Sequence, residues 1–454
     1  MNMPLAHVEP SATPTRSGLR RILGVGFGLA VIVGSTLGIG ILRAPGLVAG
    51  QISNPSIILG LWLVGGLYTL LGAVCLAELG TMLPQTGGYY VYARRTFGES
   101  VGFAVGWTDW LTYCAVLGYV SIGIGEFMAV LVPSLAGLIK IVAVIALVGL
   151  VALQSAGIRV SSRFQEATTA IKFVAFLVVV IAALVLAPAM SSAAASSPGP
   201  ASSPSLVGVV VALQAVVITY GGWQSALYFT EEDRDPNRNL PRSMIAGVAS
   251  VIVVYLLVNL ALLSVLRIPD LARSTLPAAD AAQILMGSRG RQIITVLSLV
   301  SLPPLLNAIM MIGTRILFAM GRDGLLWRRT ANVTAGGAPL AATVVTTAVA
   351  VALIASGTFQ KLVAIASLFL VFNYSVCCLA LVVLRRREPG RARPFRAWGY
   401  PWSAGIVLLG AAAFLIAAVI GDTVNAGAAL ALTAAGLLGR VAVARLRTAP
   451  APQA

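Results

Sequence analysis

A cluster of three glycines interrupts the first long apolar run of the chain and constrains the fold more than any other feature. The run covers residues 22–48, and Gly34, Gly38 and Gly40 lie near its centre. In lipid a spanning helix must satisfy its own backbone hydrogen bonds, and unwound backbone is tolerated only where it lines a cavity or is buried in protein. Because glycine weakens helices, the motif predicts an unwound segment halfway across a membrane.

Close packing of helices is the alternative explanation, because Gly34 and Gly38 also form a GxxxG pair. A second interruption favours a binding site: residues 219–223, Thr-Tyr-Gly-Gly-Trp, break the apolar run 206–229. Two glycine-interrupted segments at corresponding places in two halves indicate a transporter site at a repeat interface. Free N–H groups at one break suit a carboxylate and free carbonyls suit an ammonium group, which together fit an α-amino acid.

The composition is that of a polytopic helical membrane protein. Hydrophobic residues make up 58% of the chain and charged residues 10%, which excludes a water-soluble globule. The net charge of +16 does not indicate nucleic-acid binding, because most Lys and Arg lie in or beside the predicted cytoplasmic segments between the apolar runs. We predict an all-α protein of the cell inner (cytoplasmic) membrane, with both termini in the cytoplasm.

Twelve apolar runs are long enough to be membrane spans. Pro303 and Pro304 are expected to kink the eighth of them. The predicted spans cover about residues 22–48, 56–79, 99–131, 136–154, 164–188, 206–230, 243–266, 292–320, 339–356, 362–384, 403–420 and 424–440.

Residue types needed for several other functions are missing from the apolar runs. The only histidine, His7, lies in the N-terminal tail, so we expect no metal site, no histidine relay and no cofactor. No catalytic dyad is visible, which argues against an intramembrane enzyme, and no filter motif or ring of acids supports a channel. All four cysteines lie in apolar runs, so we expect no structural disulfide and no disulfide-linked partner: Cys75, Cys114, Cys377 and Cys378.

Five motifs in order resemble the amino acid–polyamine–organocation permeases, in particular their bacterial members and the L-type amino acid transporters. The resemblance covers nearly the whole chain. The motifs are Gly34-Ser-Thr-Leu-Gly-Ile-Gly-Ile-Leu-Arg-Ala-Pro45, Ala77-Glu-Leu-Gly-Thr-Met-Leu-Pro-Gln-Thr-Gly-Gly-Tyr-Tyr-Val-Tyr92, Tyr220-Gly-Gly-Trp223 with Thr230-Glu-Glu232, Arg315-Ile-Leu-Phe-Ala-Met-Gly-Arg-Asp-Gly-Leu325 and Arg393-Pro-Phe-Arg-Ala-Trp-Gly-Tyr-Pro401.

The resemblance implies a LeuT-like fold of two five-helix inverted repeats, in which helices one and six are broken and face each other. It also implies that spans 1, 2, 6 and 7 form a moving bundle and spans 3, 4, 8 and 9 a scaffold. The expected segments are a disordered cytoplasmic tail (1–17), the first repeat (18–188), a flexible outside loop (189–205), the second repeat (206–384), a basic cytoplasmic loop (385–402), spans eleven and twelve (403–440) and a cytoplasmic tail (441–454).

Relatives carry Gly-Ser-Gly or a near variant where this chain has Gly-Ile-Gly, so the resemblance implies backbone contacts to a substrate carboxylate. In span six it implies carbonyl groups for the amine and a tryptophan that shapes the pocket, although an ordinary packing role for that tryptophan is equally compatible. An aliphatic residue replaces the aromatic gate of many L-type relatives. The predicted binding residues are Thr36, Gly38, Ile39, Gly40, Ile218 at the gate position, Tyr220, Gly221, Gly222 and Trp223, with Tyr113 as a further lining candidate.

Lys172 is the most informative ionisable residue, because it lies inside an apolar span. The alternative is that its side chain snorkels to the cytoplasmic interface. A position eight residues into a helix is about 12 Å deep, which makes snorkelling difficult. Many relatives carry a lysine here, in the space that a sodium ion fills in distant sodium-coupled proteins of this fold. We therefore expect Lys172 to brace the unwound part of span one and to make transport sodium-independent.

The predicted function is secondary active transport of amino acids by alternating access, as an exchanger or with protons. A carrier of basic amino acids or polyamines is an alternative that requires an acid in the pocket, and Asp109 and Glu126 are its candidates. Pairing with another polar residue near a span end is the favoured role for both acids. The acids at the span ends, Glu78, Glu231 and Glu232, are expected to pair with arginines. L-type relatives use a cysteine in an outside loop to hold a heavy subunit, and this chain has none there, so no such subunit is expected.

Overall fold

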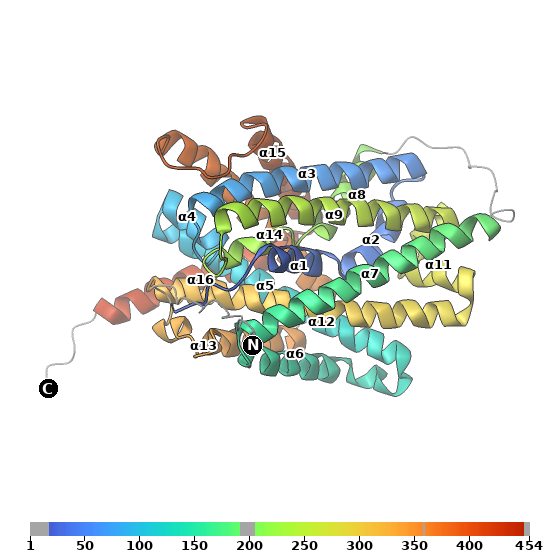
Figure 1. Cartoon of the computed structure of the whole chain (residues 1–454), viewed down its shortest axis with the longest axis horizontal. Helices are drawn as coiled ribbons and strands as arrows, with labels where there is room; N and C mark the ends of the chain where they lie inside the picture. The colour runs from blue at the N-terminus through green and yellow to red at the C-terminus, as the bar shows by residue number, and fades with distance from the viewer. Residues whose placement is uncertain (1–17, 191–204, 357–358, 449–454) are drawn as a thin grey trace, which may run out of the picture.

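The computed structural model describes residues 18–190, 205–356 and 359–448, and the regular structure of these residues is helical. Most of the long helices run along the longest dimension of the molecule (Figure 1). The helices are α1 (Val25–Thr36), α2 (Ile39–Ala49), α3 (Pro55–Met82), α4 (Tyr89–Phe97), α5 (Glu99–Leu131), η1 (Pro133–Leu138), α6 (Ile139–Ser155), α7 (Ile158–Met190), α8 (Leu206–Thr219), η2 (Ser225–Phe229), α9 (Pro236–Val265), α10 (Ile268–Arg273), α11 (Pro277–Met286), α12 (Ser288–Arg322), η3 (Arg328–Ala331), α13 (Leu340–Ser356), α14 (Phe359–Arg387), α15 (Trp402–Gly421) and α16 (Thr423–Thr448).

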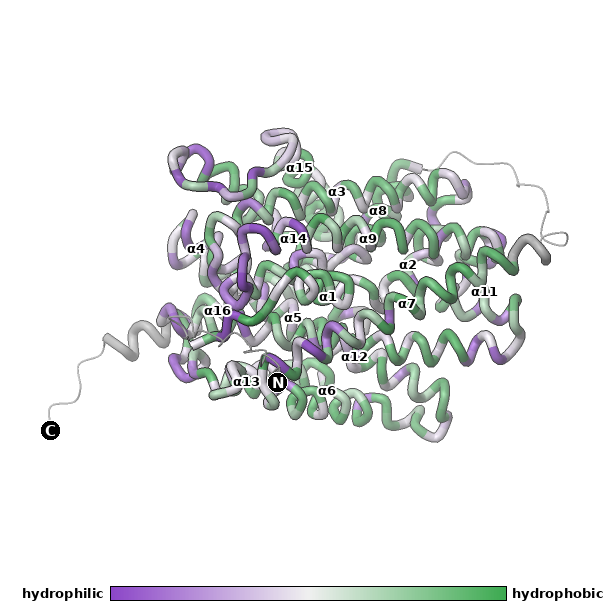
Figure 2. Tube along the Cα trace, viewed as in Figure 1, coloured by the Kyte–Doolittle hydropathy of each residue, from purple (hydrophilic) through white to green (hydrophobic). Residues whose placement is uncertain are grey.

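Many of these helices are built to cross lipid. Within the described residues eight are long and apolar enough to span a membrane, and a ninth span results if α1 and α2, which meet at a 46° bend, count as one. Figure 2 shows the hydrophobic residues along most of the helical body and the hydrophilic segments gathered mainly at one end. Two shorter apolar helices, α8 and α13, complete the pattern of apolar elements. The chain is therefore a multi-pass helical membrane protein.

Local sequence explains where several helices begin. The α5 helix covers the predicted 99–131, and α3 begins at Pro55, whose missing N–H costs nothing in the first turn of a helix. The Asn54 side chain caps α3 by accepting hydrogen bonds from the N–H groups of Ser56 and Ile57. The α9 helix starts seven residues before the predicted 243, because Pro236 opens it and its polar first turns remain helical outside the apolar run.

The structure adds helices where the sequence predicted only connections. No helix was predicted between the spans 243–266 and 292–320, but this segment contains α10 and α11, and the carbonyl oxygen of Leu271 in α10 approaches Gly46 of α2 closely. Likewise, the segment between the spans 56–79 and 99–131 contains α4. The predictions for the tail 1–17, most of the loop 189–205 and the end of the C-terminal tail fall outside the described residues.

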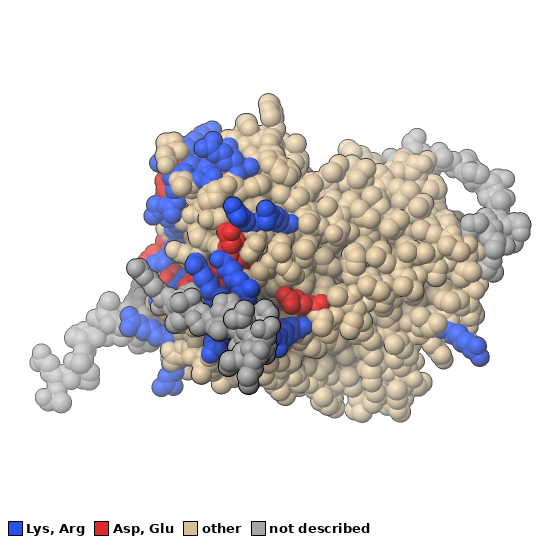
Figure 3. All heavy atoms as spheres, viewed as in Figure 1, with Lys and Arg blue, Asp and Glu red and all other residues tan. Residues whose placement is uncertain are grey.

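The three acids predicted to pair with arginines do so, and this prediction is confirmed. Each pair joins segments that lie far apart in the chain. On the face seen in Figure 3, the arginines and lysines likewise gather mainly at one end. The contacts are Glu78 with Arg385 Nε (2.9 Å) and Arg393 Nε (3.2 Å), Glu231 with Arg322 Nη1 (2.9 Å), and Glu232 with Arg315 Nε (3.0 Å) and Nη2 (3.1 Å).

Candidate functional site

The first span is interrupted where its glycines predicted. The α1 helix ends at Thr36, the next two residues are extended, and α2 begins at Ile39. Within the described residues, the N-cap Gly38 provides no side-chain hydrogen bond to the start of α2. The first backbone N–H groups of α2 therefore point out of the helix with the positive end of its dipole, which makes them suited to an anion.

The second interruption follows α8, which ends at Thr219. A turn leads from there into the short 3₁₀ helix η2. In this turn Gly222 has φ +119°, a backbone conformation that residues with a side chain rarely adopt. A Cβ atom on Gly222 would lie 2.8 Å from the carbonyl carbon of Ser35 and 2.9 Å from its oxygen. Ser35 Oγ itself lies 3.0 Å from the Gly222 carbonyl oxygen. The two interruptions are therefore in direct contact.

Tyr255 of α9 joins the two interruptions. Its hydroxyl group lies 2.7 Å from the carbonyl oxygen of Thr36 and 2.9 Å from that of Thr219. These are the last residues of α1 and α8, whose terminal carbonyls have no partner within their own helices. The tyrosine is fully buried, so its hydroxyl supplies to these carbonyl oxygens the hydrogen-bond donor that water would supply at a surface.

Lys172 of α7 reaches α1 just before the break. Its side chain is fully buried, and Nζ donates a hydrogen bond of 3.1 Å to the carbonyl oxygen of Gly34. Gln165 and Thr169, on the preceding turns of α7, both contact the carbonyl oxygen of Ala30. One face of α7 thus holds the last turns of α1 through polar contacts, and Lys172 is the contact nearest to the break.

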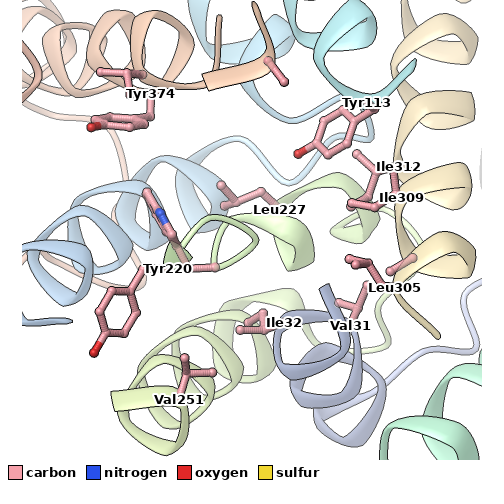
Figure 4. Close-up of a cluster of buried hydrophobic side chains, with 14 of the residues drawn as sticks. Val31, Ile32, Tyr113, Tyr220, Leu227, Val251, Leu305, Ile309, Ile312 and Tyr374 are labelled. Carbon is pink, nitrogen blue, oxygen red and sulfur yellow. The ribbon is translucent and has the colours of Figure 1, made fainter. Parts of the chain in front are cut away.

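A cavity of about 270 Å³ lies beside the two interruptions. The remaining walls come from α5, α12 and α14 and are largely apolar, and none of the described lining residues is acidic. Figure 4 shows Tyr113 beside Ile309 of α12 in this region. Six of the predicted binding residues and Tyr113 line the cavity: Thr36, Gly38, Gly40, Ile218, Gly221 and Gly222.

Two predicted residues lie away from this cavity. The Tyr220 side chain is directed to α3, where its hydroxyl donates to the Trp62 carbonyl oxygen at 3.0 Å, and Figure 4 shows its ring pointing away from Tyr113. The Trp223 indole packs on Tyr374 and against Gly72, where a Cβ would lie 3.1 Å from the ring, so that α3 has room for it. Trp223 therefore lines a second, small pocket, which shares Ile218 and Gly221 with the cavity. Ile39 begins α2, and its side chain is outside the described part of the structure.

Neither of the two acids that could bind a basic substrate lines the cavity. Glu126 lies 3.0 Å from Arg43, which lines the cavity, and so forms an ion pair. Asp109 is not among the lining residues and accepts a hydrogen bond of 2.8 Å from the Tyr228 hydroxyl. Neither acid presents a free carboxylate to the cavity.

The sequence analysis missed Tyr255 and Gln224. Gln224 lines the cavity, accepts from the Gly222 N–H at 3.2 Å and donates to the Tyr113 hydroxyl at 3.3 Å. A signal for Tyr255 was present, because it is a polar aromatic residue in the middle of the apolar run 243–266, where such groups need a partner. Its partner carbonyls could not be identified without the fold.

We expect Tyr255→Phe to lower transport about tenfold, because two terminal carbonyls lose a hydrogen-bond donor worth about 1 to 2 kcal/mol in a buried site. The measurement is the initial rate of substrate uptake into proteoliposomes, normalised to folded protein. Tyr220→Phe is the matched control: its ring packs 4.9 Å from that of Tyr255, but its hydroxyl bonds to α3 rather than to a break. Equal losses in the two variants would contradict a special role for Tyr255.

A helical membrane protein with two interrupted helices in contact beside a cavity has the architecture of a secondary transporter. Comparison with known proteins gives the family: residues 28–438 match the family model described as amino acid permease. The chain belongs to the amino acid permease family, and is accordingly a membrane transporter and not an enzyme.

Three relatives illustrate the range of similar proteins. The serine/threonine exchanger SteT of Bacillus subtilis (strain 168) is 28% identical over 426 residues, which cover 93% of this chain and 96% of that protein. The b(0,+)-type amino acid transporter 1 of Homo sapiens is 25% identical over 398 residues, or 85% of this chain and 80% of the relative. The methylthioribose transporter of Bacillus subtilis (strain 168) is 27% identical over 423 residues, covering 88% and 89%.

Proposed function

We propose that this protein carries neutral amino acids across the cytoplasmic membrane by alternating access, independently of sodium. The observation that supports this most directly is the contact between the two interrupted helices beside a cavity of about 270 Å³. The uncapped N–H groups at the start of α2 suit the substrate carboxylate, and the carbonyl ends of α1 and α8 suit its ammonium group. The largely apolar walls, without an acidic lining residue among those described, favour a neutral side chain.

The proposal includes a twelve-span topology with two inverted repeats, 18–188 and 206–384. This topology counts α1 with α2 as one interrupted span and α8 with η2 as another. It also takes α13 and α16 as spans, although length and composition alone do not identify them as such. In this topology α15 and α16 follow the repeats as the two additional spans.

We place both termini in the cytoplasm. On the face that Figure 3 shows, arginines and lysines gather mainly at one end, and an excess of these residues marks the cytoplasmic side of membrane proteins. This end also carries α4 and the loop before α15, with Arg94, Arg95 and Arg391 around one polar pocket. The cavity between the interruptions would then be separated from the cytoplasm by η2 and the buried pair of Glu232 and Arg315.

Sodium independence rests on Lys172, whose Nζ lies beside the unwound segment and donates to the Gly34 carbonyl oxygen. Exchange is supported by the relative that is named an exchanger. Carriage of basic amino acids is the less favoured alternative, because Asp109 and Glu126 are both engaged with other side chains. The four buried cysteines leave no thiol for a disulfide to a partner, so we propose function without an obligatory heavy subunit.

The test is counterflow in proteoliposomes that contain the purified protein and are loaded with one neutral amino acid. Each of the common amino acids is then added outside as a competitor of labelled uptake, with and without sodium. We expect neutral amino acids to compete, lysine and arginine to compete poorly, and sodium to have no effect. Dependence of uptake on sodium, or competition by basic amino acids alone, would refute this assignment.

A further inference from the structure

Asp109 is a buried carboxyl group that the substrate site does not use. It lies on α5, its exposed fraction is zero, and one of its oxygens accepts the hydrogen bond from Tyr228 of η2. Its other oxygen, Oδ1, has no hydrogen-bond partner among the described residues. An acid in such an environment costs several kcal/mol if charged and uncompensated, so burial favours the protonated form.

Among the described residues, the groups around Asp109 offer no compensating cation. The titratable side chains that face it are Tyr228 on η2, Tyr113 on α5 itself, Tyr89 on α4 and Cys377 on α14. The buried arginine of α12, Arg315, donates from Nε and Nη2 to the Glu232 carboxylate. Within the described chain Asp109 forms no ion pair, in contrast to Glu78, Glu231 and Glu232.

Two tyrosines connect Asp109 with the cavity. Tyr113 lines the cavity, and its ring meets that of Tyr228 edge to face, with centroids 5.5 Å apart. Tyr228 in turn donates to Asp109 at 2.8 Å. Tyr228 belongs to the second interrupted span, whereas Asp109 belongs to α5, which is one continuous helix. Movement of η2 relative to α5 would therefore break the hydrogen bond that Tyr228 donates and uncover the carboxyl group.

We propose that Asp109 is a proton-binding site that couples transport to a pH gradient. The carboxyl group holds one proton while η2 covers it. When the cytoplasmic side opens, the O–H bond breaks, the proton passes to cytoplasmic water, and the carboxylate is solvated. The emptied protein returns to the state open to the outside, where the carboxylate takes a proton from external water through the cavity that Tyr113 lines. Each cycle thus moves one proton inward with the substrate. This inference rests on the proposed alternating access and adds the group that carries the proton.

The experiment uses the purified full-length protein in proteoliposomes with a pH-sensitive dye inside. Net uptake of the neutral amino acid preferred in counterflow is measured with the outside one pH unit below the inside and without a gradient. For the unmodified protein we expect the gradient to increase uptake severalfold and the substrate to acidify the interior. In Asp109→Asn, which keeps an acceptor for Tyr228, both effects should be lost while counterflow exchange continues.

Glu99→Gln is the matched control, because it neutralises another acid of the same helix, one that pairs with Arg94 at an exposed position. Its gradient response should equal that of the unmodified protein. A gradient response that survives in Asp109→Asn, or is absent from an unmodified protein that exchanges amino acids, overturns the coupling role and leaves the proposed transport intact. Absence of amino acid exchange altogether would instead refute the proposed function.

If Asp109→Asn does not fold, Tyr228→Phe decides. Loss of the donor hydroxyl disfavours the charged carboxylate, so the midpoint of gradient-driven uptake should move to higher pH by about one unit. An unchanged midpoint would overturn the proposal, and a shift in the predicted direction would support it.

Discussion

Replacing Gly222 with alanine is expected to lower transport roughly 10- to 100-fold, since the substitution combines an unfavourable backbone conformation with a close contact. The residue has φ +119°, and the new Cβ would lie 2.8 Å from the Ser35 carbonyl carbon, a backbone atom that cannot rotate away. The two interrupted helices would be forced apart at the point where they meet. The measurement is counterflow in proteoliposomes, compared with the amount of monodisperse protein.

The matched control is Gly149→Ala in α6. A Cβ atom there would have no heavy atom within 4 Å, and alanine favours a helix over glycine by about 1 kcal/mol. Transport by this variant should equal that of the unmodified protein. Near-normal transport by Gly222→Ala would show that the two breaks need not touch for the protein to work.

Lys172→Ala is expected to reduce uptake about 100-fold, because it removes a buried donor from the Gly34 carbonyl and leaves a cavity beside α1. The last turn of α1 would lose the polar contact nearest to the break, and the start of the substrate site would no longer be held in place. Uptake is measured with and without sodium, at equal amounts of folded protein.

Lys140→Ala provides the comparison. Lys140 Nζ also donates to a backbone carbonyl, that of Ala355 at 2.8 Å, but this contact is exposed to solvent and lies away from both interruptions. Little change is expected there, because an exposed donor is readily replaced by water. Unchanged uptake in Lys172→Ala would remove Lys172 from the site.

The helix limits and the two breaks were predictable because lipid strongly restricts the conformations that the backbone can adopt. The limits of α5 and the positions of the breaks after Thr36 and Thr219 follow from apolar runs and glycines. The pairing of Glu232 with an arginine followed from the cost of a charge at a span end. These features depend on local sequence and on a solvent that allows few alternatives.

Features that depend on packing between distant helices were not predictable. The sequence does not show that Trp223 turns toward Gly72, because the direction of a side chain leaving a glycine turn is set by the space on the neighbouring helix. The α10 helix was not predicted, because its few apolar residues gain their burial mainly against α2, a distant segment of the chain. The partner of Asp109 was likewise hidden, since Tyr228 reaches it only after the second break has formed.

A tyrosine hydroxyl has a single hydrogen, and at Tyr255 that hydrogen is shared between the ends of two helices. Sharing is possible only while both carbonyl oxygens stay within about 3 Å of the same point. If one helix moved while the other did not, a buried carbonyl oxygen would lose its hydrogen-bond donor. The interrupted helices and α9 are therefore expected to move as one rigid body. Labels placed on α1 and α8 would then keep their separation while both change their distance to α5.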